Sequence, residues 1–344
     1  MQAKILHLGE QDKFTAPLFA LLEKHIDLSQ HRLLSRKGNF PWAPPCNLNL
    51  LRKNGVDWVL NFLVESYRSD KIIIHGLFDS RVIFLLFLQP WLLKKCYWVI
   101  WGGDLYAHKL DEKTWRWKIK EFFKRRIASR IGNLITYVNG DVELARLWYS
   151  AKGIHHNCLA YPSNIYRAPT ISSPVSIEVV NIQVGNSADI SNNHIEIFEK
   201  LHKNQTENYR IFVPLSYGDK SYADIVIETG SHLFGDRFIP LTNFMNFSDY
   251  SKFLETIDIG IFNHQRQQGM GNIISLLGLG KKVFLRSDIS HWQFFLNNDL
   301  TVNSIDDLEL SRLEPAVALK NSRLIQNLFS EDNLVNQYFK IFSA

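Results

Sequence analysis

Residues 264–271 combine a fixed positive charge with two glycines, a composition suited to holding an anion. The apolar pattern predicts a short strand just before them, at residues 259–262, and a helix just after them, at residues 272–279. A loop that opens a helix presents backbone N–H groups and the positive end of the helix dipole. With the guanidinium of Arg266, these donors would bind a diphosphate, although a tight turn with a surface arginine would show the same pattern. The spacing matches neither of the common glycine-rich phosphate motifs, so it does not name the ligand.

A second glycine turn is expected beyond the strand at residues 178–184, and the two turns could clasp a diphosphate from two sides. The aromatic ring of Tyr217, in the turn after the strand at residues 210–214, could contact a nucleobase or could simply be exposed. The predicted ligand-binding residues are Gly185, Asn186, Ser187, Tyr217, Arg266, Gln267, Gln268, Gly269, Gly271 and Asn272.

Two chemically active side chains follow predicted strands in the first half of the chain. His75 comes after the β-branched strand at residues 71–74, and Asp104 comes after the strand at residues 97–101 and two glycines. The carboxyl ends of parallel strands meet at one sheet edge, where ligands bind. Asp104 could act as a general base, bind sugar hydroxyls or cap the next helix, and His75 could be catalytic or structural.

Residues 109–130 form a predicted helix with nine lysines and arginines against three acidic residues, interleaved with aromatic side chains. Such a helix could lie on an anionic membrane, grip nucleic acid, or pack its apolar face on the sheet. We expect the membrane, with Trp115, Lys118, Lys124, Arg125 and Arg126 as acceptor-facing or membrane-facing residues. The apolar run at residues 82–93 would reach about 18 Å as a helix, too short for a bilayer core of about 30 Å.

The overall composition indicates a globular protein of two α/β domains. The chain has 344 residues, 46% of them hydrophobic, and a formal charge of +5, so an anionic partner must be met by a local patch. Three widely spaced cysteines argue against a disulfide framework or a zinc cluster and favour a cytoplasmic setting. The N-terminus lacks a signal-peptide pattern. The predicted organisation is a Rossmann-like domain at residues 1–162, a linker at 163–176, a second Rossmann-like domain at 177–330, and a helix at 331–344 that packs back on the first domain.

Several motifs resemble those of the bacterial TDP-N-acetylfucosamine:lipid II N-acetylfucosaminyltransferases, and they occur in the same order along the chain. The resemblance extends over residues 72–295 and is weak in residues 1–70. The motifs are His75-Gly76-x-Phe78, Trp98-x-Ile100-Trp101-Gly102-x-Asp104-Leu105-Tyr106, Val184-Gly185-Asn186-Ser187-x-Asp189 with Ser191-Asn192 and His194, Val213-Pro214 with Tyr217, and Arg266-Gln267-Gln268-Gly269-x-Gly271.

This resemblance implies an α/β GT-B glycosyltransferase, in which two Rossmann-like domains face each other across a cleft. The C-terminal domain would hold a TDP-activated sugar, and the N-terminal domain would hold an undecaprenyl diphosphate-linked saccharide at the cytoplasmic face of the bacterial inner membrane. It implies a peripheral membrane protein with no cofactor and no nucleic-acid partner.

For the reaction, the resemblance implies that Arg266 and the N–H groups around Gly269 stabilise the leaving diphosphate in place of a divalent metal. The chain contains no Asp-x-Asp pair that would hold such a metal. Asp104 is the preferred base for the acceptor hydroxyl and His75 is the second choice. A different nucleotide sugar with an O-antigen or capsule acceptor, an epimerase, and a non-catalytic nucleotide or nucleic-acid binder remain alternatives.

Overall fold

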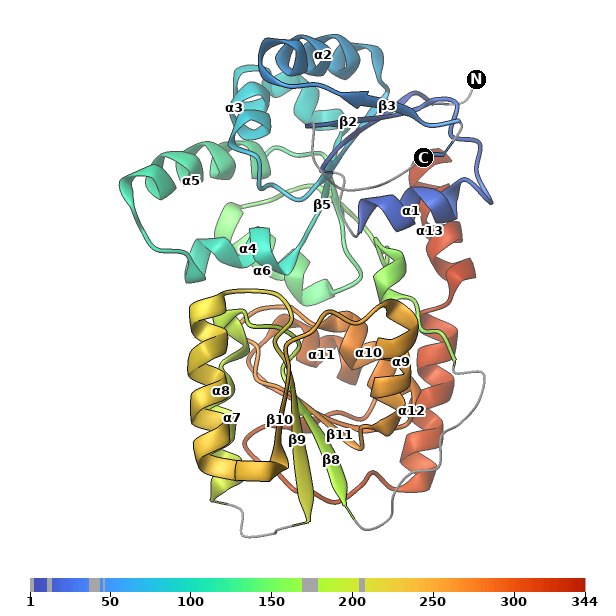
Figure 1. Ribbon diagram of the computed structural model, residues 1–344. Coiled ribbons are helices and arrows are strands. Elements are labelled where there is room, and N and C mark those ends of the chain that lie inside the picture. Colours follow the sequence, from blue (N-terminus) through green and yellow to red (C-terminus); the bar gives the residue numbers. More distant parts are fainter. Residues whose placement is uncertain are drawn as a thin grey trace. The chain divides into compact units, whose positions relative to one another are not determined.

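The computed structural model describes residues 3–10, 14–36, 44–45, 47–168, 179–203 and 208–343, and it divides the chain into two compact units. Unit 1 comprises Met1–Ile165 together with Glu331–Ala344, and unit 2 comprises Tyr166–Ser330 (Figure 1). The change from one unit to the other falls inside the stretch expected to be a linker. Part of that stretch, from residue 169 to its end, lies outside the described residues.

Unit 1 is built on a parallel sheet with the strand order β3-β2-β1-β4-β5-β6-β7. At one edge of this sheet, β2 and β3 pair as parallel neighbours. The strands are β1 (Ile5–Leu8), β2 (His31–Ser35), β3 (Asn49–Arg52), β4 (Lys71–His75), β5 (Cys96–Val99), β6 (Asn133–Ile135) and β7 (Ile154–His156). The helices are α1 (Thr15–Leu22), α2 (Gly55–Arg68), α3 (Ser80–Leu88), α4 (Gly102–Leu110), α5 (Trp115–Ala128), α6 (Asn139–Tyr149) and α13 (Glu331–Ser343), with short 3-10 helices η1 (Pro90–Lys95) and η2 (Pro162–Asn164).

The central strands of unit 1 are buried on both faces, as expected of a parallel sheet covered by helices. Helix α13, at the far end of the chain, belongs to this core. Tyr338 donates its hydroxyl hydrogen to the carbonyl oxygen of Ala160 at 2.7 Å, and the buried Lys71 ammonium donates to the carbonyl oxygen of Ile341 at 2.7 Å. The last helix therefore stabilises the first domain.

Unit 2 repeats the architecture with the parallel order β10-β9-β8-β11-β12-β13. Its strands are β8 (Val180–Val184), β9 (Tyr209–Pro214), β10 (Phe238–Leu241), β11 (Ile259–Phe262), β12 (Lys282–Leu285) and β13 (Asn303–Ser304). Its helices are α7 (His194–His202), α8 (Lys220–Phe234), α9 (Phe247–Thr256), α10 (Met270–Gly278), α11 (Ser290–Asn297) and α12 (Pro315–Leu328), with short 3-10 helices η3 (Ile190–Asn192) and η4 (Gly235–Arg237).

The strand order of each sheet reverses once, between β1 and β4 in unit 1 and between β8 and β11 in unit 2. In open parallel sheets, the connections leave in opposite directions at such a point, and a crevice forms beyond the carboxyl ends of the two strands. The topology therefore predicts one binding site in each unit. Within the described ranges, no helix is long and apolar enough to span a bilayer.

Candidate functional site

The turn after β8 is shaped by Gly185, whose φ of +67° lies in the left-handed region. A Cβ at this position would lie 2.4 Å from Nε2 of His194 and 2.8 Å from Oδ1 of Asn192. The backbone N–H of the next residue, Asn186, donates to that same Asn192 oxygen at 2.9 Å. Only glycine fits here, and the turn is held tightly against the start of α7.

The loop after β11 meets this turn at Gly269, the residue before α10, which has a φ of +69°. A Cβ on Gly269 would lie 2.6 Å from the ring of His264 and 3.3 Å from Oδ1 of Asn186. His264 is buried, and its Nε2 lies 2.9 Å from Asn192 Oδ1, the atom that also holds the Gly185 turn. The two glycine turns are therefore joined by His264 and Asn192, beside the N-terminus of α10.

The side chain of Asn186 lies between the two turns. Its amide nitrogen donates to the hydroxyl of Tyr217 at 2.9 Å, while its buried Oδ1 has no hydrogen-bond partner among the residues that the structure describes. The buried side chain of Gln183, on β8, donates to Oδ1 of Asn272 at 3.1 Å. Its Oε1 also has no hydrogen-bond partner among the described residues. Unpaired buried amide oxygens are costly, so this is a place where a polar ligand would be stabilised.

Arg266 is a half-buried cation at the edge of this site. Its Nη2 lies 3.0 Å from Oδ2 of Asp189, and Asp189 also accepts from the backbone N–H of Ser191 at 2.9 Å. Burial opposes the negative charge of Asp189, but these hydrogen bonds and the guanidinium together hold its pKa below the ordinary value. Gln268 joins the network by accepting the Ser191 hydroxyl hydrogen at 2.6 Å.

The structure thus brings together most of the ligand-binding residues predicted in the second half of the chain. Gln267 lies in the same loop, and Gly271 lies in the first turn of α10. Sequence reasoning did not assign a role to the residues that connect the site, although four of them stand inside or beside motifs that were noticed. The missed residues are Gln183, Asp189, Asn192, Tyr250 and His264.

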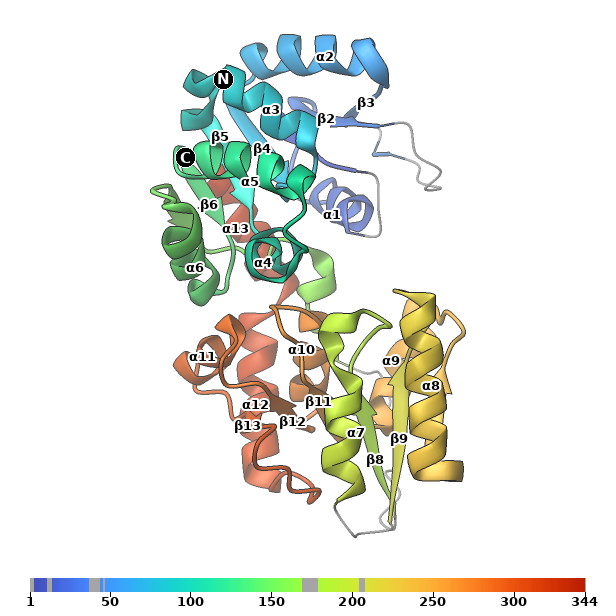
Figure 2. The same ribbon diagram turned by 90° about the vertical axis from the view of Figure 1, so that its left-hand side faces the viewer.

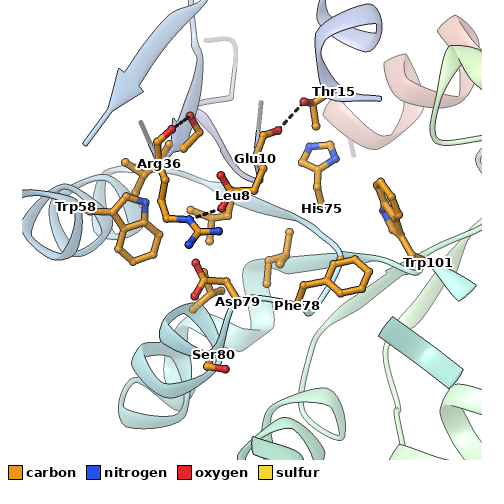
Figure 3. A pocket seen from close by; sticks show the side chains of 16 residues that line it. Leu8, Glu10, Thr15, Arg36, Trp58, His75, Phe78, Asp79, Ser80 and Trp101 are labelled. Carbon is orange, nitrogen blue, oxygen red and sulfur yellow. Dashed lines mark hydrogen bonds and ion pairs between the residues drawn. The ribbon is translucent and has the colours of Figure 1, made fainter. Parts of the chain in front are cut away.

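Unit 1 has a pocket of about 400 Å³ at its own reversal point, beyond the carboxyl ends of β1, β2 and β4 (Figure 3). Its walls combine aromatic rings with charged groups. The rings are those of Trp58, Phe78 and Trp101, and the acidic groups are the carboxylates of Glu10 and Asp79. Rings that cover apolar faces, next to carboxylates that accept from hydroxyls, suit a sugar.

Each carboxylate of the pocket is paired with an arginine. Oε1 of Glu10 accepts from Nε of Arg36 at 2.5 Å, and Oδ2 of Asp79 accepts from Nη2 of Arg81 at 2.7 Å. Burial opposes the charge of Asp79, but its hydrogen bonds from Arg81 keep the pKa of this carboxyl below its ordinary value. Asp79 also caps α3 through the Arg81 backbone N–H, so Glu10 is the less constrained of the two acids.

His75 lines this pocket and starts a chain of three imidazoles that runs into the core. Its Nε2 lies 3.2 Å from Nδ1 of His7, whose Nε2 lies 3.0 Å from Nδ1 of His31. Nδ1 of His75 lies 2.7 Å from the hydroxyl of Tyr161. Burial and the neighbouring imidazoles lower the pKa of His7 far below its ordinary value, and burial lowers that of His31 to about 4. Both ring nitrogens of His75 are engaged inside the protein, so this geometry argues against its predicted role as a direct base.

Of its three anticipated roles, Asp104 has that of the acid that caps a helix, and the preference for it as the base needs correction. It is 1% exposed, and its two oxygens accept from Trp101 N at 2.8 Å, Leu77 N at 2.6 Å and Trp98 Nε1 at 2.6 Å. Burial raises the pKa of Asp104, while the Lys124 ammonium and these three donors oppose the rise. A carboxylate enclosed in this way positions β5 and α4 and does not reach a substrate.

Helix α5 is oriented differently from both simple expectations. Lys124, predicted to face a membrane, is 2% exposed, and its ammonium donates to the Asp104 carbonyl oxygen and, at 3.1 Å, to the Tyr149 hydroxyl. The alternative in which the helix packs by its apolar side chains holds only in part, because Ile127 is buried whereas Trp115 is 67% exposed. Lys118, Arg125 and Arg126 are exposed.

Two α/β units, each built on an open parallel sheet with one reversal point, form the GT-B fold. The structure is similar to that of HepE from Anabaena, solved in complex with UDP and glucose, with a TM-score of 0.72, 10% sequence identity and 99% of each chain covered. It is also similar to sucrose-phosphate synthase from Thermosynechococcus elongatus, with a TM-score of 0.71, 12% identity and 98% of each chain covered. A third similar structure is WaaG, a glycosyltransferase involved in lipopolysaccharide biosynthesis, with a TM-score of 0.56, 12% identity, and 98% of this chain and 94% of that one covered.

The chain itself belongs to glycosyl transferase group 56, the 4-alpha-L-fucosyltransferase family. The family match spans residues 56–324, well over half of the chain. The family predicted from the motifs is therefore confirmed, and so is the GT-B fold that the resemblance implied.

Proposed function

We propose that this glycosyltransferase moves a deoxyamino sugar of the N-acetylfucosamine type from a TDP-sugar to a lipid-linked saccharide. The observation that carries the proposal is the pair of glycine turns in unit 2, which lie beside the N-terminus of α10, an unpaired buried amide oxygen and a half-buried arginine. Backbone N–H groups at a helix N-terminus bind phosphate, and the amide oxygen of Asn186 would accept from a hydroxyl or N–H of the donor.

In this reaction, the acceptor oxygen forms a bond to C1 of the donor sugar while the bond from C1 to the diphosphate oxygen breaks. The electron pair leaves with TDP, so negative charge grows on the diphosphate. The N–H groups at the start of α10 and the guanidinium of Arg266 stabilise that charge without a divalent metal. Arg266 is paired with Asp189 at 3.0 Å, and the diphosphate would take over or share this guanidinium.

We propose that the acceptor saccharide binds in the pocket of unit 1. Trp58, Phe78 and Trp101 supply apolar walls, and Glu10 accepts the proton of the attacking hydroxyl in the role first given to Asp104 and His75. The glutamate uses Oε1 for Arg36, which leaves Oε2 to meet the acceptor. Glu10→Gln is expected to lower transfer at least about tenfold while TDP binding is kept.

An acceptor attached to undecaprenyl diphosphate would place the protein, as a peripheral protein, at the cytoplasmic face of the bacterial inner membrane. The exposed cations Lys118, Arg125 and Arg126 on α5 support contact with anionic headgroups. A second candidate is a transferase of the same fold that uses another nucleotide sugar and an O-antigen or capsule acceptor.

The test is thermal denaturation of the full chain with TDP and with UDP, followed by hydrolysis assays on a panel of TDP- and UDP-sugars. TDP is expected to raise Tm, and Arg266→Ala to weaken its binding by about 10- to 150-fold, the value of one charged hydrogen bond. Asp189→Asn removes the competing carboxylate and keeps the guanidinium, so it should bind TDP at least as tightly as the wild type. Arg210→Ala, at an exposed arginine on β9, is the matched control.

The outcomes distinguish the proposed function from its alternatives. If neither nucleotide raises Tm in the wild type, the donor site is not where we place it. If Arg266→Ala and Asp189→Asn both lower Tm but leave the Kd for TDP unchanged, the ion pair is only structural. Turnover of free nucleotide sugar without an acceptor would favour an epimerase, and steeply salt-dependent oligonucleotide binding would favour a nucleic-acid binder.

A further inference from the structure

Helix α2 of unit 1 presents apolar side chains to solvent on the side opposite its buried face. Val56, Leu60, Val64 and Tyr67 follow one another at spacings of four, four and three residues, which places them in one stripe along the helix. All four are exposed, and Val56 is 74% exposed. The residues that α2 buries are Trp58, Phe62, Glu65 and Ser66. The helix is therefore apolar on two sides, and one of them is exposed to solvent.

The next two helical segments repeat this arrangement. On α3 and η1, the exposed residues are Phe84, Leu88 and Trp91, whereas α3 buries Val82, Ile83 and Leu86. On α5, the exposed residues are Trp115, Ile119 and Phe122, whereas the helix buries Glu121, Lys124, Ile127 and Ala128. Both exposed sets have a spacing of four and then three residues. Three stripes in succession are not the scattered single apolar residues of an ordinary surface.

The three stripes belong to one surface, which we call the apolar face and define as the ten exposed residues just named. Trp91 donates its indole N–H to the Tyr67 hydroxyl at 3.0 Å, which joins η1 to α2. The rings of Phe84 and Phe123 meet edge to face at 5.6 Å between centroids, which joins α3 to α5. Figures 1 and 2 both show α3 between α2 and α5.

The exposed charges on the four segments that carry the apolar face are nearly all positive. Exposed basic residues on these segments are Arg68, Lys94, Arg116, Lys118, Arg125 and Arg126, whereas Asp57 is the one exposed acid on α2, α3, η1 and α5. The guanidinium of Arg126 lies 5.0 Å from the Phe122 ring centroid, and that of Arg116 lies 5.3 Å from the Trp115 ring centroid. Tryptophan and tyrosine with flanking cations are typical of the boundary between lipid headgroups and acyl chains.

We propose that the apolar face inserts into the headgroup region of an anionic bilayer, so that α2, α3 and η1 are as important for docking as the basic helix α5. This inference rests on the proposed function in one respect: a lipid-linked acceptor would be found at the bilayer. Insertion of apolar side chains and attraction to anionic lipid both contribute to membrane binding. Either contribution alone gives only marginal binding, whereas the two together give stable peripheral binding.

The test uses the purified full chain and flotation with two kinds of vesicle, phosphatidylcholine alone and phosphatidylcholine with phosphatidylglycerol. Leu60→Glu and Leu88→Glu are expected to lower partitioning into the anionic vesicles by about tenfold or more each, because each removes an inserted side chain and adds a negative charge. Ile225→Glu on α8 and Leu319→Glu on α12 change equally exposed apolar residues of unit 2 and should partition as the wild type does.

A depth measurement separates insertion from surface attraction. Brominated acyl chains should quench the tryptophan fluorescence of the bound wild type, and Trp91→Phe and Trp115→Phe should each lose part of that quenching. Wild-type partitioning by both α2 and α3 variants would overturn the proposal, and so would vesicle binding that only Lys118→Gln and Arg126→Gln weaken. A concentration-dependent dimer that Leu60→Glu dissociates, without lipid binding, would assign the apolar face to a second copy of the chain.

The lipid result and the nucleotide result are independent. The TDP-induced rise in Tm should be the same in Leu60→Glu, Leu88→Glu and the wild type, because the nucleotide site is in unit 2. If the wild type binds vesicles but does not respond to TDP, the proposed function fails and the docking face stands. If TDP raises Tm but the protein does not bind anionic vesicles, the docking face fails and the proposed function stands.

Discussion

Buried neutral histidines should make this protein unusually sensitive to mild acid. Burial lowers the pKa of His31, His194 and His291 to about 4, whereas an unfolded histidine titrates near 6.5. Unfolding therefore takes up protons below about pH 6.5, so stability is full above that pH, falls as the pH drops, and levels off below about pH 4. At pH 5, each of these histidines lowers the free energy of unfolding by about 2 kcal/mol.

His291 allows this reasoning to be tested at a single position. It is fully buried on α11, and neither of its ring nitrogens has a hydrogen-bond partner among the described residues. His291→Leu should leave the free energy of unfolding near pH 7.5 equal to or above that of the wild type, and should retain about 2 kcal/mol more at pH 5. His232→Gln, at an exposed position of α8, should behave as the wild type at both pH values.

The assay is urea denaturation across this pH range on protein labelled with fluorotryptophan, followed by fluorine NMR. Trp292 is the one tryptophan between residues 166 and 330, so its signal reports the unfolding of unit 2 separately from that of unit 1. The reasoning is refuted if His291→Leu loses stability between about pH 7.5 and pH 5 as steeply as the wild type does. It is also refuted if the variant is less stable at neutral pH, because His291 would then have a partner.

Three further predictions concern single residues. Gly185→Ala and Gly269→Ala should each lower the free energy of unfolding by at least about 1 kcal/mol and abolish the TDP-induced rise in Tm. Gly235→Ala is the control, because its Cβ would meet nothing within 4 Å, and it should keep that rise. TDP binding retained by the first two variants would contradict the role of the tight turns. Lys124→Met should destabilise unit 1 by about 2 kcal/mol or more in denaturant titrations, whereas Arg126→Gln should change stability by less than about 0.5 kcal/mol. Asp104→Ala leaves three donors without their acceptor and should cost about 3 kcal/mol or more, with transferase activity falling in proportion to the folded fraction. A fully folded but inactive variant would restore Asp104 as the catalytic base.

The strands that could be predicted are those whose residues are buried on both faces and therefore form short apolar runs. β4 and β11 are examples, and both were located to within a residue or two. β2 was missed because it begins with His31 and Arg32, which are polar in isolation. His31 is buried because it meets His7 from a neighbouring strand, and a pairing of that kind is not visible in the local pattern.

The candidate site was predicted as far as local backbone chemistry determines it. Gly185 and Gly269 stand where a turn needs a left-handed residue, and this requirement can be recognised from a few neighbouring residues. The partner of Arg266 could not be predicted, because Asp189 lies 77 residues away in the chain. Lys124 shows the same limit, since it stands in a basic run and is nevertheless buried against Tyr149.

The return of α13 to unit 1 has a consequence for how the molecule is made on the ribosome. Unit 2 is one uninterrupted stretch of chain, whereas unit 1 lacks its last helix until every residue of unit 2 has been synthesised. Lys71 finds its carbonyl acceptors on Ile341 and Phe342, so these hydrogen bonds of the first domain cannot form until the last helix has been synthesised. The second domain is therefore expected to mature first, and shortening the chain at its C-terminus should harm the domain encoded at its beginning.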